Sequence, residues 1–426
     1  MQATPQYGRF QMTREEAGAL LSSFVSFMLL LACYYLLRPV RDALAASLGA
    51  DSIKYLSTMV FVVMLLIVPV FGWLFARVPR PLLVPGLYAF FILNLGVFAL
   101  AFGRYGADGV TGAGWARAFY VWVTVFNMFA VSVFWSSMAE VWSEPQGRRF
   151  FGVVSAGGSL GGLLGPLLAR LLVAHVAVSG LVWISAALLT GALLTLGALL
   201  RRSTAIVAAS SANAGEREPS AGAAFEGLKL IGRTPFLAGI AVLVSLGSFL
   251  GMIVYIEMAR LVAAAFANAA ERTAYYSSRD LWVNAGAFVL QLVLLGQVTR
   301  RLGVGPALIG AGCVVFAGCI ALGLDPTLAT LTGLSVLLRW SEFGIAKPAR
   351  DMLYTVVPAV AKYQSKNVID TTVYRGSDMA SGWLQSLIGR LGVGLAGWGW
   401  IAAAMTVVLT LVSACVGRGY RRRGGK

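Results

Sequence analysis

The sequence has few of the charged residues from which soluble proteins build their surfaces. Charged residues make up 12% of the 426 residues and hydrophobic residues 58%, whereas soluble domains carry roughly 25% charged residues. A soluble chain of this composition would lack the polar surface needed to cover itself. The composition therefore excludes an ordinary soluble protein.

Residue types that carry metal or nucleophilic chemistry are also scarce. The single histidine, His175, argues against a metal site built from histidines, and the four cysteines lie in apolar runs without CxxC spacing. No GxxxxGK[ST] phosphate loop occurs, and no histidine–carboxylate cluster or activated serine or cysteine is visible. We therefore expect no enzyme activity, no cofactor and no metal.

Long apolar runs dominate the remainder of the chain. A membrane-spanning helix needs about 20 mostly apolar residues, and such runs predict about twelve helices. The expected ranges are 17–37, 55–76, 81–103, 115–139, 150–174, 178–200, 236–258, 280–299, 304–324, 327–347, 367–392 and 395–416. The segment between the two sets of six is rich in alanine, serine, glycine and charge, which is typical of a flexible linker. The sequence thus predicts an all-α membrane protein with a six-helix bundle at 1–200, a cytoplasmic linker at 201–234 and a second bundle at 235–426.

The net charge of +16 has a membrane explanation. In a soluble protein it would suggest a nucleic-acid partner, but cytoplasmic loops of membrane proteins collect lysine and arginine. Placing the N-terminus inside puts most of the 34 basic residues in cytoplasmic loops. We therefore expect both termini in the cytoplasm, a lipid bilayer around the helices and no nucleic-acid partner.

The two sets of helices look duplicated. The segment Gly72–Arg77 after the second helix resembles Gly296–Arg301 after the eighth, and Gly162 in the fifth helix matches Gly382 in the eleventh. Together these matches indicate two parallel six-helix repeats, which is the layout of major facilitator transporters.

A cluster of charges closes the first predicted helix. Arg38, Arg41 and Asp42 follow Tyr34 and Tyr35, and the three charges share one face if the helix continues through the intervening proline. Two guanidiniums beside aromatic rings suit a phosphate or a carboxylate. The alternative is that these side chains reach the outer membrane interface as anchors.

Two further groups of charges fall inside predicted helices. Arg339 and Glu342 lie three residues apart in the tenth helix and can neutralise each other or hold substrate. In the eleventh helix Arg375 and Asp378 share a face from which Asp370 is offset. Charges within a membrane helix are costly, so these residues are candidates for the substrate site.

Glu257 stands alone, late in the seventh predicted helix. An intramembrane carboxylate either titrates and couples protons to transport, or pairs with an arginine across the cavity. We include Glu257 among the candidate site residues and regard the proton as a candidate coupling ion.

Glycines crowd the fifth predicted helix. Gly152, Gly157, Gly158, Gly161, Gly162 and Gly165 lie within four turns. This density indicates close helix packing, which serves either sliding between the halves or a static bundle.

Four segments resemble one known family. They are Tyr34–Leu44, Gly49–Leu56, Glu144–Gly152, and Lys347–Tyr354 with Asn367–Arg375. They are similar to the ATP/ADP translocases of plastids and obligate intracellular bacteria, also called NTP/NDP exchange transporters. The resemblance spans most of the chain and implies that Glu257 and Arg41 fall on positions tied to transport.

The chain departs from that family at two charged positions. Val123 falls near the family's fourth-helix glutamate, and Asp378 falls on its eleventh-helix lysine. The resemblance implies a major facilitator-like secondary transporter in the bacterial inner (plasma) membrane, which moves a small anionic, phosphorylated or nucleotide-like solute by exchange or ion coupling. A membrane-embedded scaffold or sensor on the same fold is the alternative, because a fold does not fix function.

Overall fold

The computed structural model describes residues 13–107, 109, 111–207, 229–291 and 303–424, and within these ranges the regular structure is helical. The first half contains α1 (Arg14–Ser47), η1 (Ala50–Ser52), α2 (Ile53–Arg77), α3 (Arg80–Tyr105), α4 (Ala113–Val141), α5 (Glu144–Leu172) and α6 (Val178–Val207). The second contains α8 (Pro235–Ala265), α9 (Ala269–Leu290), α11 (Val304–Leu324), α12 (Leu328–Trp340), η3 (Ser341–Ala346), α13 (Lys347–Leu353), η4 (Tyr354–Val356), α14 (Ala359–Val368), η5 (Ile369–Val373), α15 (Tyr374–Gly389) and α16 (Leu395–Arg422). Nine helices in these ranges are long and apolar enough to cross a membrane. The predicted all-α membrane protein is confirmed.

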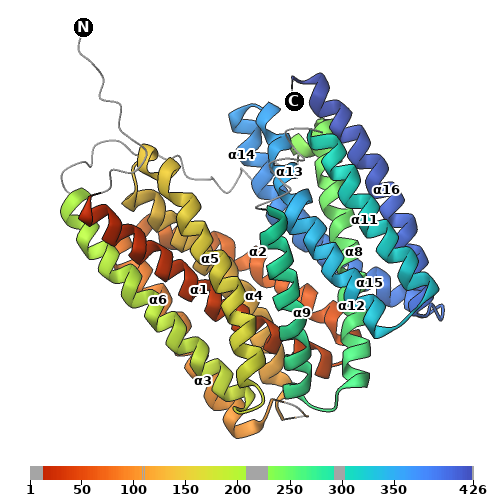
Figure 1. Cartoon of the computed structure of the whole chain (residues 1–426), viewed down its shortest axis with the longest axis horizontal. Helices are drawn as coiled ribbons and strands as arrows, with labels where there is room; N and C mark the ends of the chain where they lie inside the picture. The colour runs from red at the N-terminus through yellow and green to blue at the C-terminus, as the bar shows by residue number, and fades with distance from the viewer. Residues whose placement is uncertain (1–12, 108, 110, 208–228, 292–302, 425–426) are drawn as a thin grey trace.

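The helices form two bundles that lie side by side in Figure 1. Helix α1 begins, and α16 ends, at the same end of the molecule, which we call the termini side, and the opposite end is the far side. The bundles meet mainly where α5 packs on α9, α2 packs on α15, and α1 packs on α8 and α9. Helices α2 and α9 hold the second position of their halves, and α5 and α15 hold the fifth. This reciprocal pairing is what two parallel repeats predict, and it confirms the layout in two six-helix halves.

The domain boundaries remain a prediction. Most of the expected linker at 201–234 lies outside the described residues, although α6 continues to Val207 and residues 229–233 are helical. Part of the second repeat motif, Gly296–Arg301, is also outside them.

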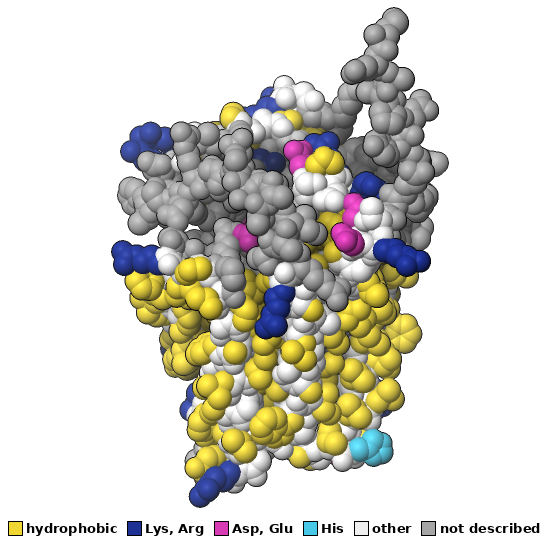
Figure 2. Space-filling view, turned by 90° about the vertical axis from the view of Figure 1, so that its left-hand side faces the viewer, with side chains coloured by type: hydrophobic (Ala, Val, Ile, Leu, Met, Phe, Trp, Pro, Cys, Tyr) yellow, Lys and Arg dark blue, Asp and Glu magenta, His cyan; other side chains and the backbone are white. Residues whose placement is uncertain are grey.

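The outer surface of the bundles is apolar. Figure 2 shows hydrophobic side chains over most of one face, with Lys and Arg gathered mainly towards its two ends. On α2 the large side chains of Leu65, Leu66, Val70 and Trp73 are more than half exposed. Such a surface would aggregate in water and is suited to lipid.

Two predicted helix boundaries are wrong for one reason. Helix α1 runs to Ser47 and does not stop at residue 37, and α9 begins at Ala269 and not at residue 280. In each case a charged or polar stretch that hydropathy places outside the membrane continues the helix. These charged stretches can continue the helices because their charges have partners inside the protein. Pro39 removes one backbone hydrogen bond but does not end α1.

The glycines of α5 fit its backbone against α1. A Cβ on Gly157 would lie 2.5 Å from the carbonyl oxygen of Phe24, and one on Gly165 would lie 2.7 Å from that of Ala32. Both helices belong to the first half, so this close packing serves the static bundle. Gly162 differs, because Asn284 of α9 donates a hydrogen bond of 2.6 Å to its carbonyl oxygen from the other half.

Two long helices of the second half each contain a π-helical turn. η3 interrupts the rod formed by α12 and α13, and η5 interrupts the rod formed by α14 and α15. The end of α9 supports the first turn, because Gln291, which directly follows this helix, donates a hydrogen bond of 2.9 Å to the carbonyl oxygen of Phe343. The indole of Trp340 donates to the carbonyl oxygen of Trp282 at 3.0 Å. π-turns are frequent at functional sites, and residues of both of these turns line the central cavity.

Candidate functional site

A cavity of about 570 Å³ lies between the two halves. Its volume falls within the range of small-molecule sites, roughly 300–1,000 Å³. Among the described residues six cations and three carboxylates line it. The cations are Arg38, Arg41, Arg339, Lys347, Arg350 and Arg375, and the carboxylates are Glu342, Asp370 and Asp378. The surface of the cavity is therefore suited to an anion.

The first half contributes two arginines framed by tyrosines. Arg38 and Arg41 stand three residues apart on α1, and both line the cavity. The Arg38 guanidinium lies 5.8 Å from the ring centre of Tyr35, and that of Arg41 lies 5.3 Å from the ring of Tyr120 on α4. Tyr34 and Tyr35 also line the cavity, as the sequence predicts for a site. Arg38 is 7% exposed, which contradicts the alternative that it anchors the helix at a membrane interface.

Behind these arginines lies a buried ionic network. Asp42 bonds Arg41 at 2.7 Å and Arg279 of α9 at 3.4 Å, while Asp280 contacts Arg279 at 2.7 Å and Arg38 at 3.5 Å. Tyr255 of α8 donates a hydrogen bond of 3.2 Å to Asp42. Asp42, Arg279 and Asp280 do not line the cavity. The expected substrate residue Asp42 therefore lies behind the cavity wall, where it orients Arg41.

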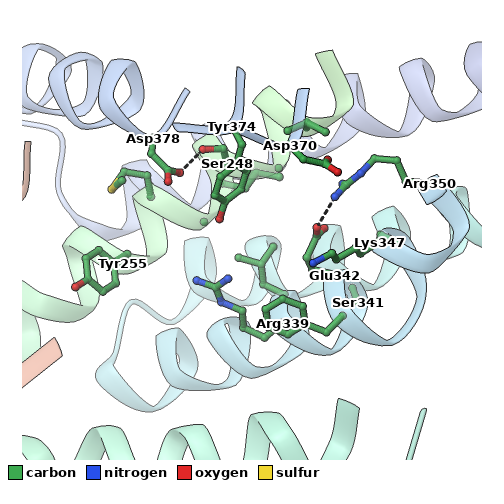
Figure 3. A pocket seen from close by; sticks show the side chains of 18 of the residues that line it. Ser248, Tyr255, Arg339, Ser341, Glu342, Lys347, Arg350, Asp370, Tyr374 and Asp378 are labelled. Carbon is green, nitrogen blue, oxygen red and sulfur yellow. Dashed lines mark hydrogen bonds and ion pairs between the residues drawn. The ribbon is translucent and has the colours of Figure 1, made fainter. Parts of the chain in front are cut away.

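The second half contributes a group around the first π-turn, shown in Figure 3. Glu342 pairs with Arg350 at 3.2 Å, which contradicts the alternative that Arg339 and Glu342 neutralise each other. The π-turn that starts at Ser341 separates the two side chains. Arg339 instead lies 5.7 Å from the ring of Phe343 and faces the space beside Tyr374. Within the described ranges neither Arg339 nor Lys347 makes an ion pair.

Helix α15 and the second π-turn complete the wall. Arg375 and Asp378 form the expected pair at 3.4 Å, and Ser248 of α8 donates a hydrogen bond of 2.5 Å to Asp378. Asp370 is offset from them and faces the Arg350 side of the cavity (Figure 3). All three residues line the cavity, as expected for members of a site.

Glu257 lies away from this cavity. The residue is 2% exposed, and its carboxylate accepts hydrogen bonds from Gln385 at 3.0 Å and from Arg260 at 3.2 Å. The arginine partner stands on the same helix and not across the cavity. Glu257 is absent from the residues that line the cavity, so its carboxylate is not part of the cavity wall.

Sequence reasoning missed Arg279, Asp280 and Lys54. A signal for the first two was available, because Tyr275-Tyr276-Ser-Ser-Arg279 repeats the spacing of Tyr34-Tyr35-Leu-Leu-Arg38. Lys54 is 8% exposed, donates a hydrogen bond of 2.6 Å to Ser386 of the other half, and lies 5.3 Å from the ring of Trp383. No charge pattern pointed to Lys54, since its partners are neutral.

The arrangement can bind and orient an anion. Guanidiniums offer forked donors to phosphate or carboxylate oxygens, and tyrosine rings offer surfaces for an aromatic or sugar group. In the described part of the chain no group of three metal-binding side chains occurs.

Comparison with known proteins agrees with this geometry. The model of the Major Facilitator Superfamily matches residues 19–350. A bacterial homolog of the human lysosomal transporter Spinster, solved inward-facing and unoccupied, is 12% identical with a TM-score of 0.54, and the match covers 97% of this chain and 98% of that one. The nucleoside transporter NupG is 12% identical with a TM-score of 0.59, covering 95% and 99%. A POT family transporter in complex with 5-aminolevulinic acid is 15% identical with a TM-score of 0.62, covering 98% of both chains. No curated protein matches the sequence.

At these identities the solved structures establish the fold alone. The family match covers well over half of the sequence. The chain belongs to the major facilitator superfamily.

Proposed function

We propose that this carrier moves an anionic, phosphorylated or nucleotide-like solute across the membrane by alternating access. The observation that carries the proposal is the excess of cations around the cavity between the halves. Four of its six cations are matched by carboxylates, whereas Arg339 and Lys347 have no ion-pair partner among the described residues. An unmatched guanidinium in a membrane interior is costly, and a bound anion removes that cost.

The aromatic side chains favour a solute with a flat or sugar-like part beside its anionic group. Tyr34, Tyr35, Tyr120 and Tyr374 surround the space between the arginines of the two halves. Nucleoside phosphates have this combination, and the resemblance to the ATP/ADP translocases points the same way. Asp378, where that family has a lysine, pairs with Arg375 and reduces the positive charge. This favours a solute with fewer phosphates than ATP.

Binding is tested first by melting the purified protein with ADP, AMP, sugar phosphates and dicarboxylates. A ligand that binds the folded state raises the melting temperature. Radiolabelled versions of the compounds that stabilise the protein are then offered to proteoliposomes. We expect uptake of a nucleotide or sugar phosphate, and Arg339→Ala is the matched variant that loses it. Stabilisation without uptake would favour a sensor on a carrier fold.

The proposal places both termini in the cytoplasm of a bacterial cell with the protein in its inner membrane. Glu144 is the exposed first residue of α5, and Ala177 lies in the exposed turn after this helix. These positions are at opposite ends of a spanning helix. An impermeant thiol reagent outside intact cells should label Ala177→Cys and spare Glu144→Cys, and the reverse pattern would invert the topology.

A further inference from the structure

Arg38 and Arg41 each face two environments. Their side chains line the cavity, yet each also holds a carboxylate that lies behind the cavity wall. The two contacts differ in strength. The Arg41–Asp42 pair is short at 2.7 Å, whereas the Arg38–Asp280 contact is 3.5 Å long and leaves Asp280 Oδ2 without a hydrogen bond. Arg38 is therefore the cation that a ligand displaces most easily from its internal partner.

The same contacts join the two halves. Arg38 and Asp42 belong to α1, whereas Arg279 and Asp280 belong to α9 of the other half. Tyr255 adds a third link from α8 to Asp42 at 3.2 Å. In Figure 1, α9 stands at the boundary between the bundles. The network therefore acts as an ionic bridge between α1 and α9.

An apolar seal lies next to this bridge on the far side. Ala43, Ala46 and Ile53 of the first half are fully buried against Met258 and Tyr276 of the second. Asp42 immediately precedes the first of these residues. Opening the far side requires this seal to part, and the seal cannot part while the ionic bridge next to it holds α1 against α9.

While the cavity is empty, each carboxylate of the network contacts two arginines. Three arginines face two aspartates, which leaves one positive charge in excess. If Arg38 and Arg41 turn to an anion, Arg279 alone must neutralise Asp42 and Asp280. Two carboxylates on one cation in a low-dielectric interior are unfavourable. Separation of the helices would admit water and relieve the imbalance.

We propose that Asp280 and Asp42 are internal competitors of the transported anion. They hold Arg38 and Arg41 from behind in the empty carrier and lose them when the anion binds. This loss releases α9 from α1 and unlocks the far side. The inference rests on the proposed function in that the competing ligand is an anion. A group with several anionic oxygens engages both arginines and releases both carboxylates, so phosphate groups open the seal more effectively than single carboxylates.

The test uses Ala46→Cys as a reporter, because residue 46 is 1% exposed within the seal. The rate at which a maleimide labels it in the purified full-length protein is followed by peptide mass spectrometry, so that the native cysteines do not interfere. Asp280→Asn removes one competitor, and we expect labelling to rise by roughly 5- to 150-fold, the usual range of coupling between sites. Asp325→Asn is the matched control, because its carboxylate caps an exposed loop beside α12. Tyr255→Phe, which removes a single hydrogen bond, should give a smaller rise and serves if Asp280→Asn fails to fold.

ADP and inorganic phosphate are then added as probes. Each probe that raises the melting temperature should also accelerate labelling of Ala46→Cys, and should do so less in the Asp280→Asn background. Asp280→Asn labelling no faster than Asp325→Asn would overturn the proposal, as would a probe that stabilises the protein and leaves labelling unchanged. If neither probe binds while Asp280→Asn still opens the seal, the bridge stands and the proposed solute class fails.

Discussion

Replacing Gly165 by alanine should loosen the contact between α1 and α5. A Cβ at this position would lie 2.7 Å from the carbonyl oxygen of Ala32, 2.7 Å from the Cβ of Tyr35 and 2.9 Å from the backbone nitrogen of Leu36. Ordinary contacts begin near 3.4 Å, so the added carbon is about 0.7 Å too close. None of the three atoms belongs to a side-chain end that can rotate away. The helices must therefore separate, and overpacking of this kind costs about 1–3 kcal/mol.

The matched control is Gly152→Ala in the same helix. A Cβ on Gly152 meets no atom within 4 Å, so that variant reports the intrinsic gain of alanine over glycine in a helix, about 1 kcal/mol. The difference in unfolding free energy between the two variants isolates the packing cost. Unfolding in mixed micelles, followed by tryptophan fluorescence, should place Gly165→Ala about 1–3 kcal/mol below Gly152→Ala. Equal stability of the two variants would show that α1 and α5 can separate at this contact without cost, against the inference that their close packing serves a static bundle.

Three further predictions concern the charged residues. Arg38→Ala leaves Asp280 with a single cation and should lower the unfolding free energy by about 3–5 kcal/mol. Adding Asp280→Asn to this variant should recover most of the lost stability in thermal melts. If the double variant recovers no stability, the ion pair between Arg38 and Asp280 is contradicted. Arg339→Ala should weaken ADP binding, measured by calorimetry, by about 10- to 100-fold through loss of a charge-assisted hydrogen bond. The ADP affinity of Arg339→Lys should lie between those of the wild type and Arg339→Ala, because lysine lacks the planar fork. Unchanged ADP affinity in Arg339→Ala would show that Arg339 is not part of the site. Glu257→Gln should leave the ADP affinity within about twofold of the wild-type value, because the carboxylate lies outside the cavity. The same variant should abolish proton-driven uptake if Glu257 couples protons. A large loss of ADP affinity would place Glu257 in the binding site.

Hydrophobic runs predicted the number and order of the helices, because a spanning helix must be apolar over most of its length. The same rule misplaced the end of α1 and the start of α9. A hydropathy argument counts Arg38 and Asp42 as costs. It cannot see that Asp280 and Arg279, from a distant part of the chain, neutralise them. The boundaries failed where a long-range pair overrides the local composition.

The candidate site was predictable in its residue types and less so in its pairings. Intramembrane charge identified Arg38, Arg339 and Arg375, all of which line the cavity. Helical spacing gave the right partner for Arg375 and the wrong one for Glu342, because spacing rules assume a regular helix and η3 is not one. A π-turn leaves no clear mark in a single sequence.

The buried network also bears on how the chain enters the membrane during synthesis. Asp42 and Arg279 are separated by 237 residues, and at a synthesis rate of 5–20 residues per second roughly 10–50 s pass between their emergence from the ribosome. During that interval α1 must reside in the bilayer without its partner from α9. The Arg41–Asp42 pair, at 2.7 Å within α1 itself, neutralises two of the three charges in the network that α1 contributes. Arg38 has no partner until α9 is synthesised, because its carboxylate partner Asp280 lies on that helix. Completion of the second half therefore fixes the final depth of the first helix in the membrane.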